Sequence, residues 1–322
     1  MFTLKPPQIV SARVFTSMPD HFRRKAVVPP WAKANRSGQA TDSFLEGPVF
    51  DEAGNLFVCD IPFGRIFRID TTGHWTQIAE YDGEPNGMKF LSAHELIIAD
   101  YRNGLMICDI RTGDVRTHLD RRNTERFKGV NDLCFDAAGN LYFTDQGQTG
   151  LHDPTGRVYR LRSNGQLDLL MANVPSPNGI VLSTDEQVLY VAATRGNCVW
   201  RAPLMLDGSV SKVGQFFTSF GPTGPDGLAV DTHGRLIVAN PGLGVVWVLN
   251  RRAEPEWIVR CPEQDPADGT GAWLTNIAFG GPDRRTLFCT ESLTGSILSV
   301  ELDVPGMSVR QGRNTTAMSD QS

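Results

Sequence analysis

The sequence predicts an all-β protein, a six-bladed β-propeller whose four-stranded antiparallel blades surround a central channel. Three observations predict it. One short strand pattern recurs six times, an oxygen-bearing residue stands just before each copy, and successive copies lie 40, 45, 47, 48 and 49 residues apart, the length of a propeller blade. These six residues, here called the ring residues, are Glu46, Asn86, Asn131, Asn178, Asp226 and Thr275.

Each copy contains the material for one blade. In the first copy the run GPVFD is followed by the turn EAGN and by a second run, LFVCD. Gly and Asn supply the positive φ angles that a tight hairpin needs. A third run, GRIFRID, and the turn TTGH follow, and they lead to a fourth strand. Four short strands joined by hairpins are typical of a propeller blade, and no segment shows a convincing helical period.

The repeat runs unbroken from about residue 46 to residue 302, so residues 1–322 are expected to form a single domain. A ring of blades must also be closed, and residues 8–15 are expected to do so as an outer strand of the sixth blade, beside residues 286–302. Residues 303–322 are polar and are expected to fray.

Residues 17–45 form an N-terminal arm that breaks the repeat. Pro29 and Pro30 oppose regular structure there, and basic residues gather between Arg23 and Arg36. Two interpretations stay open at this point. The arm is either a solvated segment or a lid over one end of the channel, with Trp31 or the basic residues facing an anionic substrate.

Composition narrows the function classes. The net charge of −5 and the pI near 5.7 give no basic footprint for nucleic acid, and no charge run indicates a membrane surface. The apolar runs are too short for a transmembrane helix, and the N-terminal residues lack the pattern of a signal peptide. We therefore expect a cytoplasmic enzyme whose partner is a small molecule, with no nucleic acid and no membrane.

The ring residues predict a metal site. All six inner strands of a propeller run the same way, so the residues at their starts meet at one mouth of the channel. The set is rich in oxygen and contains no Cys or His, which favours a hard cation such as Ca²⁺. Mg²⁺ or Mn²⁺, and sometimes Zn²⁺, are the alternatives. Three of the ring positions are also common turn dipeptides, namely Asn-Gly at 86 and 178 and Asp-Gly at 226. Each of them opens the first strand of a copy instead of joining two strands, and the hairpin turns are already supplied by segments such as AGN, THG and SNG.

Five motifs in the same order and register resemble the SMP-30, gluconolactonase and luciferin-regenerating enzyme family of six-bladed propellers, over roughly residues 44 to 302. The motifs are EGPVFD at 46–51, GVNDLCFDAAGNLYFTD at 129–145, PNGIVLS at 177–183, GPDGLAVD at 224–231 and NIAFGGPDRRTLFCT at 276–290. Drug-responsive lactonases of the staphylococcal type and enzymes of the diisopropyl fluorophosphatase type share this architecture.

The resemblance implies roles for several ring residues. Glu46, Asn178 and Asp226 match the metal-binding residues of the family, and Asn131 matches an Asn that completes the shell or contacts substrate. Asp226 also matches the Asp proposed as general base. Family members use calcium or, less often, zinc, manganese or magnesium. Gly129 stands where sugar-lactone enzymes of the animal type carry Arg. With this departure and an apolar wall from Trp31 and Phe44, an aromatic or aliphatic lactone is expected rather than gluconolactone.

The expected activity is that of a metal-dependent lactonase, a gluconolactonase-like carboxylic ester hydrolase. The metal would polarise the lactone carbonyl, and Asp226 would act as general base for water. The expected substrate contacts are Asn131, Asp132, Asn86, His152 and Trp273, the last two from the loop segments 147–156 and 265–276. Hydrolysis of a phosphotriester or another ester at the same metal is one alternative. A non-catalytic propeller scaffold stabilised by calcium is the other.

Overall fold

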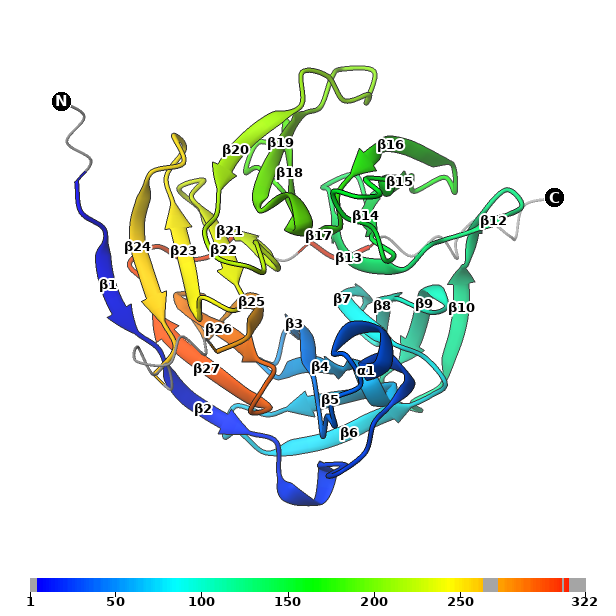
Figure 1. Cartoon of the computed structure of the whole chain (residues 1–322), viewed down its shortest axis with the longest axis vertical. Coiled ribbons are helices and arrows are strands. Elements are labelled where there is room, and N and C mark those ends of the chain that lie inside the picture. The colour runs from blue at the N-terminus through cyan, green and yellow to red at the C-terminus, as the bar shows by residue number, and fades with distance from the viewer. Residues whose placement is uncertain (1–4, 263–271, 309, 313–322) are drawn as a thin grey trace.

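A computed structural model describes residues 5–262, 272–308 and 310–312, and it confirms the six-bladed propeller (Figure 1). The blades are arranged around a central channel, and the first strand of each blade lies innermost. Blade 1 comprises β3 (Leu45–Phe50), β4 (Leu56–Asp60), β5 (Arg65–Ile69) and β6 (Trp75–Glu80). Blade 2 comprises β7 (Pro85–Ser92), β8 (Glu95–Asp100), β9 (Gly104–Asp109) and β10 (Val115–Leu119).

The next two blades follow the same order. Blade 3 comprises β13 (Val130–Phe135), β14 (Leu141–Asp145), β15 (Gly156–Leu161) and β16 (Leu167–Val174). Blade 4 comprises β17 (Pro177–Leu182), β18 (Val188–Ala193), β19 (Cys198–Pro203) and β20 (Gly214–Thr218). A small hairpin of β11 (Arg121–Arg122) and β12 (Glu125–Arg126) connects blades 2 and 3.

The N-terminal strands complete the last two blades. Blade 5 comprises β21 (Leu228–Val230), β22 (Leu236–Asn240), β23 (Val245–Leu249) and β24 (Pro255–Arg260). Blade 6 comprises β25 (Leu274–Gly280), β26 (Thr286–Glu291) and β27 (Ser296–Glu301). The strand β2 (Arg13–Ser17) pairs antiparallel with β27, whereas β1 (Gln8–Ser11) pairs in parallel with β24.

The ring closure therefore differs in part from the sequence prediction. Residues 13–15 lie on the sixth blade as expected, but residues 8–11 belong to the fifth blade. The chain crosses between the two blades at Ala12, whose amide donates to the carbonyl oxygen of Arg260 at 2.9 Å. One short N-terminal segment thus joins blades 5 and 6, because it contributes one strand to each of them.

Apolar side chains fill every interface between neighbouring blades. In the described part of the chain, six buried apolar clusters each combine residues of two adjacent blades, and together they run around the whole ring. Phe57 and Phe90, for example, meet edge to face across the interface of blades 1 and 2, with ring centroids 5.4 Å apart. Burial of both faces explains why the strand runs of the sequence are nearly continuous in apolar residues.

Four glycines bring neighbouring inner strands close together at the ring residues. Each of them directly follows a ring residue: Gly47, Gly87, Gly179 and Gly227. A Cβ atom at Gly87 would lie 2.9 Å from the carbonyl oxygen of Asn131, and one at Gly179 would lie 2.8 Å from the amide nitrogen of Leu228. Both distances are shorter than a carbon atom tolerates, so only glycine permits this approach of one blade to the next.

The two blades without such a glycine join the ring through hydroxyl groups. Thr144 of blade 3 donates from Oγ1 to the carbonyl oxygen of Asn178 at 2.8 Å. Thr275 of blade 6 donates to the carbonyl oxygen of Leu45 at 3.1 Å, and Ser292 donates to the same oxygen at 2.6 Å. The starts of all six inner strands are therefore joined in one closed circle.

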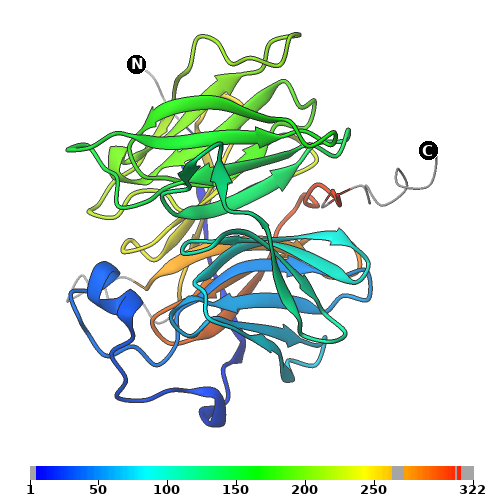
Figure 2. The ribbon, with the colours of Figure 1, turned by 90° about the vertical axis from the view of Figure 1, so that its right-hand side faces the viewer.

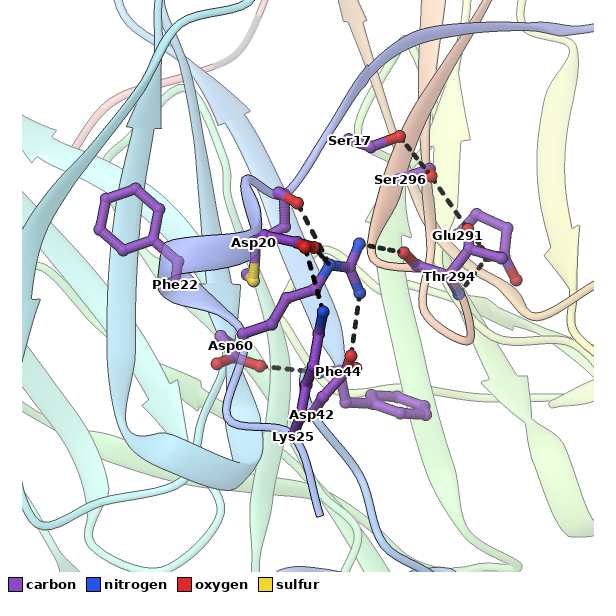
Figure 3. A network of polar contacts seen from close by, with 12 residues as sticks. Ser17, Asp20, Phe22, Lys25, Asp42, Phe44, Asp60, Glu291, Thr294 and Ser296 are labelled. Carbon is purple, nitrogen blue, oxygen red and sulfur yellow. Dashed lines mark hydrogen bonds and ion pairs between the residues drawn. The ribbon is translucent and has the colours of Figure 1, made fainter. Parts of the chain in front are cut away.

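The N-terminal arm packs against blades 1 and 6 (Figure 3). Arg23 donates to Asp42 at 3.2 Å and to the carbonyl oxygen of Thr294 at 2.5 Å, and Ser17 is hydrogen-bonded to Ser296 at 2.8 Å. The arm contains the 3-10 turn η1 (Asp20–Phe22), and its helix contacts the 3-10 turn η2 (Ile61–Phe63). The basic residues Arg24 and Lys25 pair with Glu80 and Asp20. These ion pairs tie the basic residues to the surface of the protein.

The expectation that the prolines oppose regular structure in the arm is wrong. The helix α1 (Pro30–Asn35) begins at Pro30, because the first position of a helix needs no amide hydrogen. Trp31 of α1 is buried against Phe44 and Ile61. Within the described ranges no helix has both the length and the apolar character needed to span a membrane.

The C-terminal segment lies across the opposite end of the channel from α1 (Figure 2). The amide of Met307 donates to the carbonyl oxygen of Val230 at 3.0 Å, and that of Gly312 donates to the carbonyl oxygen of Phe90 at 3.2 Å. Arg310 forms an ion pair with Glu186 at 2.7 Å. Met307, Ser308 and Arg310 cover a small apolar cavity that the ends of the inner strands line. The first part of the segment expected to fray is therefore held against blades 2, 4 and 5.

The close approach of the blades predicts an effect of Gly179→Ala. The added methyl group would meet the backbone of blade 5, so the free energy of unfolding should fall by about 1 to 3 kcal/mol, as for other overpacked sites. Gly214→Ala is the matched control, because a Cβ atom there meets nothing within 4 Å, and its effect should stay within about 0.5 kcal/mol. Urea unfolding of the two variants makes the comparison, and equal midpoints would contradict it.

Candidate metal and catalytic site

A repeated acidic residue fixes the backbone before several ring residues. Asp60, Asp100, Asp145 and Glu291 each end the second strand of a blade. Their carboxylates accept from the amides of Phe44 at 2.7 Å, Glu84 at 3.0 Å, Gly129 at 2.8 Å and Trp273 at 2.9 Å, respectively. Each of these amides stands two positions before a ring residue. Four ring residues are thus held at the channel mouth by the same side-chain hydrogen bond.

Three carboxylates converge at this mouth. Glu46 accepts at Oε2 from the Gly47 amide and from Asn276 Nδ2, both at 2.8 Å. The charges of Glu46 and Asp132 both raise the pKa of Asp226, and the Asn178 side chain lowers it. Residues from blades 1, 3, 4 and 5 therefore meet at one place, as the register of the sequence repeat predicts.

The surroundings of these carboxylates favour their neutral forms. Burial raises the pKa of Glu46 to about 7, against the hydrogen bonds from Gly47 and Asn276. Burial, and after it the negative charges of Glu46 and Asp132, raise the pKa of Asp226 well above its usual range, while Arg195 acts in the opposite direction. Burial also raises the pKa of Asp132, which the charge of Lys89 partly offsets. Clustered acids of this kind are unfavourable without a positive partner.

Two buried oxygen atoms at the mouth have no hydrogen-bond partner in the described part of the chain. They are Oδ1 of Asp226 and Oδ1 of Asn131, and both are shielded from solvent. A buried polar atom without a partner is costly, so it points to a bound group. No three His, Cys, Asp or Glu side chains among the described residues are spaced to share a metal ion. A cation here would thus need the amide oxygens of Asn131 and Asn178 beside the carboxylates, and oxygen ligands of this kind suit Ca²⁺.

The remaining ring residues have other contacts. The hydroxyl of Thr275 is hydrogen-bonded to Thr290 at 2.9 Å and to Ser292 at 2.8 Å, so it belongs to the seam between blades 6 and 1. The carbonyl oxygen of Asn86 accepts from the thiol of Cys59 at 2.9 Å. Asn86 itself is buried, with 9% of its surface exposed.

A polar pocket of about 420 Å³ adjoins this mouth. Its wall comes from α1, from the loop between β14 and β15 and from the 3-10 turn η3 (Thr194–Gly196). The lining residues are Asn35, Tyr101, Gln146, Gly147, Gln148, Thr149, Gly150, Leu151, His152, Ser176 and Arg195. Gln148 donates to Asn35 at 3.3 Å and to Tyr101 at 2.9 Å. The arm therefore reaches the rim of the pocket through Asn35.

The two loop residues expected to contact substrate, His152 and Trp273, lie in different surroundings. His152 lies on the wall of the polar pocket. Trp273 packs instead in the cluster of Trp31 and Phe44, with its ring centroid 6.4 Å from that of Phe44. Residues 265–271 of the predicted loop segment lie outside the described residues.

The space beside Gly129 is filled by an aromatic ring. A Cβ atom at this position would lie 2.8 Å from two ring atoms of Tyr101. No longer side chain fits there while Tyr101 keeps its place. The sequence departure at residue 129 thus has a structural counterpart, since Tyr101 forms the pocket wall at this point.

Three residues of the site are absent from the sequence prediction. Asn276 directly follows the ring residue Thr275, where four other blades have Gly, and this difference was the available signal. Gln146 accepts from Asn131 Nδ2 at 2.9 Å. Arg195 lies on η3, close enough for its charge to act on Asp226. Both belong to loops outside the repeat pattern, so the sequence carries no comparable signal for them.

Comparison with known proteins connects this geometry to a family. The family model described as "SMP-30/Gluconolactonase/LRE-like region" matches residues 44–294. A protein named lactonase drp35 from Staphylococcus haemolyticus is 30% identical over 278 residues, which is 82% of each chain. A protein of the same name from Staphylococcus aureus is also 30% identical over 278 residues, again with 82% of each chain covered.

Solved structures share the fold at lower identity. A regucalcin from Agrobacterium tumefaciens, described as a calcium-binding protein, superposes with a TM-score of 0.75 at 21% identity, covering 96% of this chain and 100% of that one. A gluconolactonase from Xanthomonas campestris superposes with a TM-score of 0.68 at 22% identity, covering 94% and 99%. The length of the family match and the 30% identity of the relatives decide the assignment: the chain belongs to the SMP-30/gluconolactonase/LRE-like family.

Proposed function

We propose that this protein hydrolyses a lactone with the help of a divalent cation, Ca²⁺ in the first instance, held by Glu46, Asn131, Asn178 and Asp226. The observation that carries the proposal is the pair of buried, unpartnered oxygen atoms of Asp226 and Asn131 beside the buried carboxylate of Glu46. The relatives at 30% identity are named lactonases, which supports a lactone as the substrate.

A cation bound by these residues would act as a Lewis acid on the lactone carbonyl and would stabilise the negative charge that develops on its oxygen. Asp226 is the proposed general base, because a bound cation would favour its ionised form, which can accept a proton from a water molecule. The same proton then goes to the alkoxide oxygen that leaves when the ring opens. Asn178, whose side chain lowers the pKa of Asp226, is proposed to lie beside this carboxylate as a ligand of the cation.

Asn131 and Asp132 complete the site on the side of blade 3. Gln146 holds the amide of Asn131 through Nδ2, so that Oδ1 is turned away from this hydrogen bond. Asp132 is fixed by the Leu133 amide, which donates to its Oδ1 at 2.8 Å. The proposed role of Asp132 is to add negative charge next to the cation. Asn86 and His152 are proposed substrate contacts, and Trp273 is proposed to stabilise the arm beside the mouth.

A panel of lactones tests the function, with Asp226→Asn as the informative variant. Wild-type activity on at least one lactone should disappear with chelator and return with Ca²⁺. Asp226→Asn should lower kcat by a factor of about 10² to 10⁴, the usual contribution of a general base. Asp207→Asn is the matched control, since this carboxylate lies in an exposed turn and binds Ser209, and its kcat should equal that of the wild type.

Three results would contradict the proposal in different ways. Undiminished turnover of Asp226→Asn would remove its role as the base. Turnover of phosphotriesters or simple esters, with no lactone hydrolysed, would move the activity to another substrate class. Thermal stabilisation by Ca²⁺ with no turnover of any ester would indicate a calcium-stabilised scaffold.

The acids at the mouth predict a pH dependence of stability in the metal-free protein. The pKa of Glu46 is about 7 in the folded state and about 4.3 in an unfolded chain. The proton on Glu46 therefore contributes its full stabilisation to the fold below about pH 4.3, the unfolded pKa. This contribution is lost as the pH rises through about 7, the folded pKa. The Tm of the chelated protein should fall between pH 5 and pH 8. Added Ca²⁺ should raise the Tm more at pH 8 than at pH 5, because the ligands must lose their protons to bind it.

Glu46→Gln should weaken both effects, since an amide does not titrate. The control is Glu52→Gln, in which the altered side chain lies exposed in the turn between β3 and β4, and it should behave as the wild type. A calorimetric series over this pH range measures the Tm values. A wild-type Tm that rises steadily from pH 5 to pH 8 without metal would contradict the prediction.

A further inference from the structure

The polar pocket has a charge character opposite to that of the site it adjoins. Among the residues that the structure describes, its lining includes Arg195 and His152 and no Asp or Glu. Six of the other lining residues carry neutral hydrogen-bonding side chains: Asn35, Tyr101, Gln146, Gln148, Thr149 and Ser176. The mouth beside it holds the carboxylates of Glu46, Asp132 and Asp226. A molecule that spans both would present an electron-rich carbonyl to a cation at the mouth and an acceptor group to the pocket.

The pocket is joined directly to the candidate cation site. Gln146 accepts from Asn131 Nδ2 and donates from Nε2 to Ser176 Oγ, both at 2.9 Å. The turn that carries Arg195 is tied to the other side of the site, because Thr194 donates from Oγ1 to the carbonyl oxygen of Pro225 at 2.7 Å. Pro225 directly precedes Asp226. The position of Arg195 is thus set by the same backbone that positions the proposed base.

The side chain of Arg195 is exposed and forms no hydrogen bond or ion pair with any residue in the described ranges. Three arginines elsewhere in the propeller do have carboxylate partners: Arg65 pairs with Asp60, Arg102 with Asp82 and Arg157 with Glu125. The positive charge of Arg195 acts on Asp226 through space only. A guanidinium held at a pocket wall without a protein acceptor is suited to a ligand acceptor, and its fork geometry matches a carboxylate.

We propose that Arg195 binds a carboxylate substituent of the substrate, so that the protein selects lactones that carry a carboxylate outside the ring. The inference rests on the proposed lactone hydrolysis and adds the substrate class to it. Gln148 and His152 also line this pocket and would limit the size of the substituent. The lactone ring itself remains over the oxygen atoms of Asp226 and Asn131.

Matched substrates test the inference through a ratio. The two substrates are a γ-butyrolactone with a carboxylate on its ring and the same lactone with a carboxamide in that place. In the wild type kcat/KM should favour the carboxylate by about tenfold or more, the usual effect of one hydrogen-bonded charge pair. Arg195→Met should lower this ratio about tenfold, mainly through KM. Arg195→Lys should keep part of the preference, because lysine retains the charge and loses the fork.

Salt and a second arginine provide the controls. Raising the ionic strength should reduce the preference of the wild type and leave that of Arg195→Met unchanged, since salt screens an exposed charge pair. Arg201→Met removes an exposed arginine of the same blade that lies outside the pocket lining. Its ratio should equal that of the wild type. A ratio that does not change in Arg195→Met, or an equal loss on both substrates, would overturn the inference while lactone hydrolysis stands.

Binding of unreactive analogues separates the inference from the proposed function. The probes are the γ-lactams that correspond to the two lactones, and titration calorimetry measures their affinity without any turnover. The wild type should bind the carboxylate lactam about tenfold more tightly than the carboxamide lactam, and Arg195→Met should bind both alike. If no lactone is hydrolysed but this difference appears, the proposed function fails and the anion site stands. Equal binding of the two lactams by the wild type would overturn the anion site.

Discussion

The close approach of neighbouring inner strands at the channel mouth is the constraint on which the site depends. Where Gly47, Gly87, Gly179 and Gly227 allow the backbones to meet, the preceding side chains are left at one narrow opening. Six segments that are far apart in the sequence then place acids and amides within reach of one another. The apolar clusters between the blades stabilise this arrangement, while the mouth itself carries unfavourable burial of charge. The fold thus supports a local electrostatic cost that a bound cation would offset.

Much of the fold could be predicted because the blade is a repeated unit with its own turn chemistry. Six copies in register define the strand order, and the apolar content of the strands indicates that both faces are covered. The partner of an isolated strand has no such signal. Residues 8–11 look like a strand for the sixth blade, yet they pair in parallel with β24 of the fifth blade. Pro30 likewise begins α1. Proline breaks a helix when it lies in the interior, but it is well suited to the first position.

In the candidate site, residues at the repeated position could be predicted from the sequence, whereas loop residues outside the repeat could not. Residue types at a repeated position are readable, and this brought Glu46, Asn178 and Asp226 to one opening. Side-chain direction is less readable: Thr275 occupies an equivalent position, but its hydroxyl is used between two blades. Loop residues such as Arg195 follow no period, and their distance from the ring depends on how each connection folds back. Only the structure shows that the ring of Tyr101 fills the space beside Gly129, where a longer side chain would otherwise lie.

The C-terminal segment makes the two ends of the channel different. Met307, Ser308 and Arg310 lie across the end opposite the ring residues, where they are bound to blades 4 and 5. In the proposed reaction, a substrate that enters on the side of α1 would leave by the same opening as a ring-opened hydroxy acid. The product carries one negative charge more than the lactone, and it is formed next to three acidic side chains. With the C-terminal segment across the other end, substrate binding and product release would compete for the same opening.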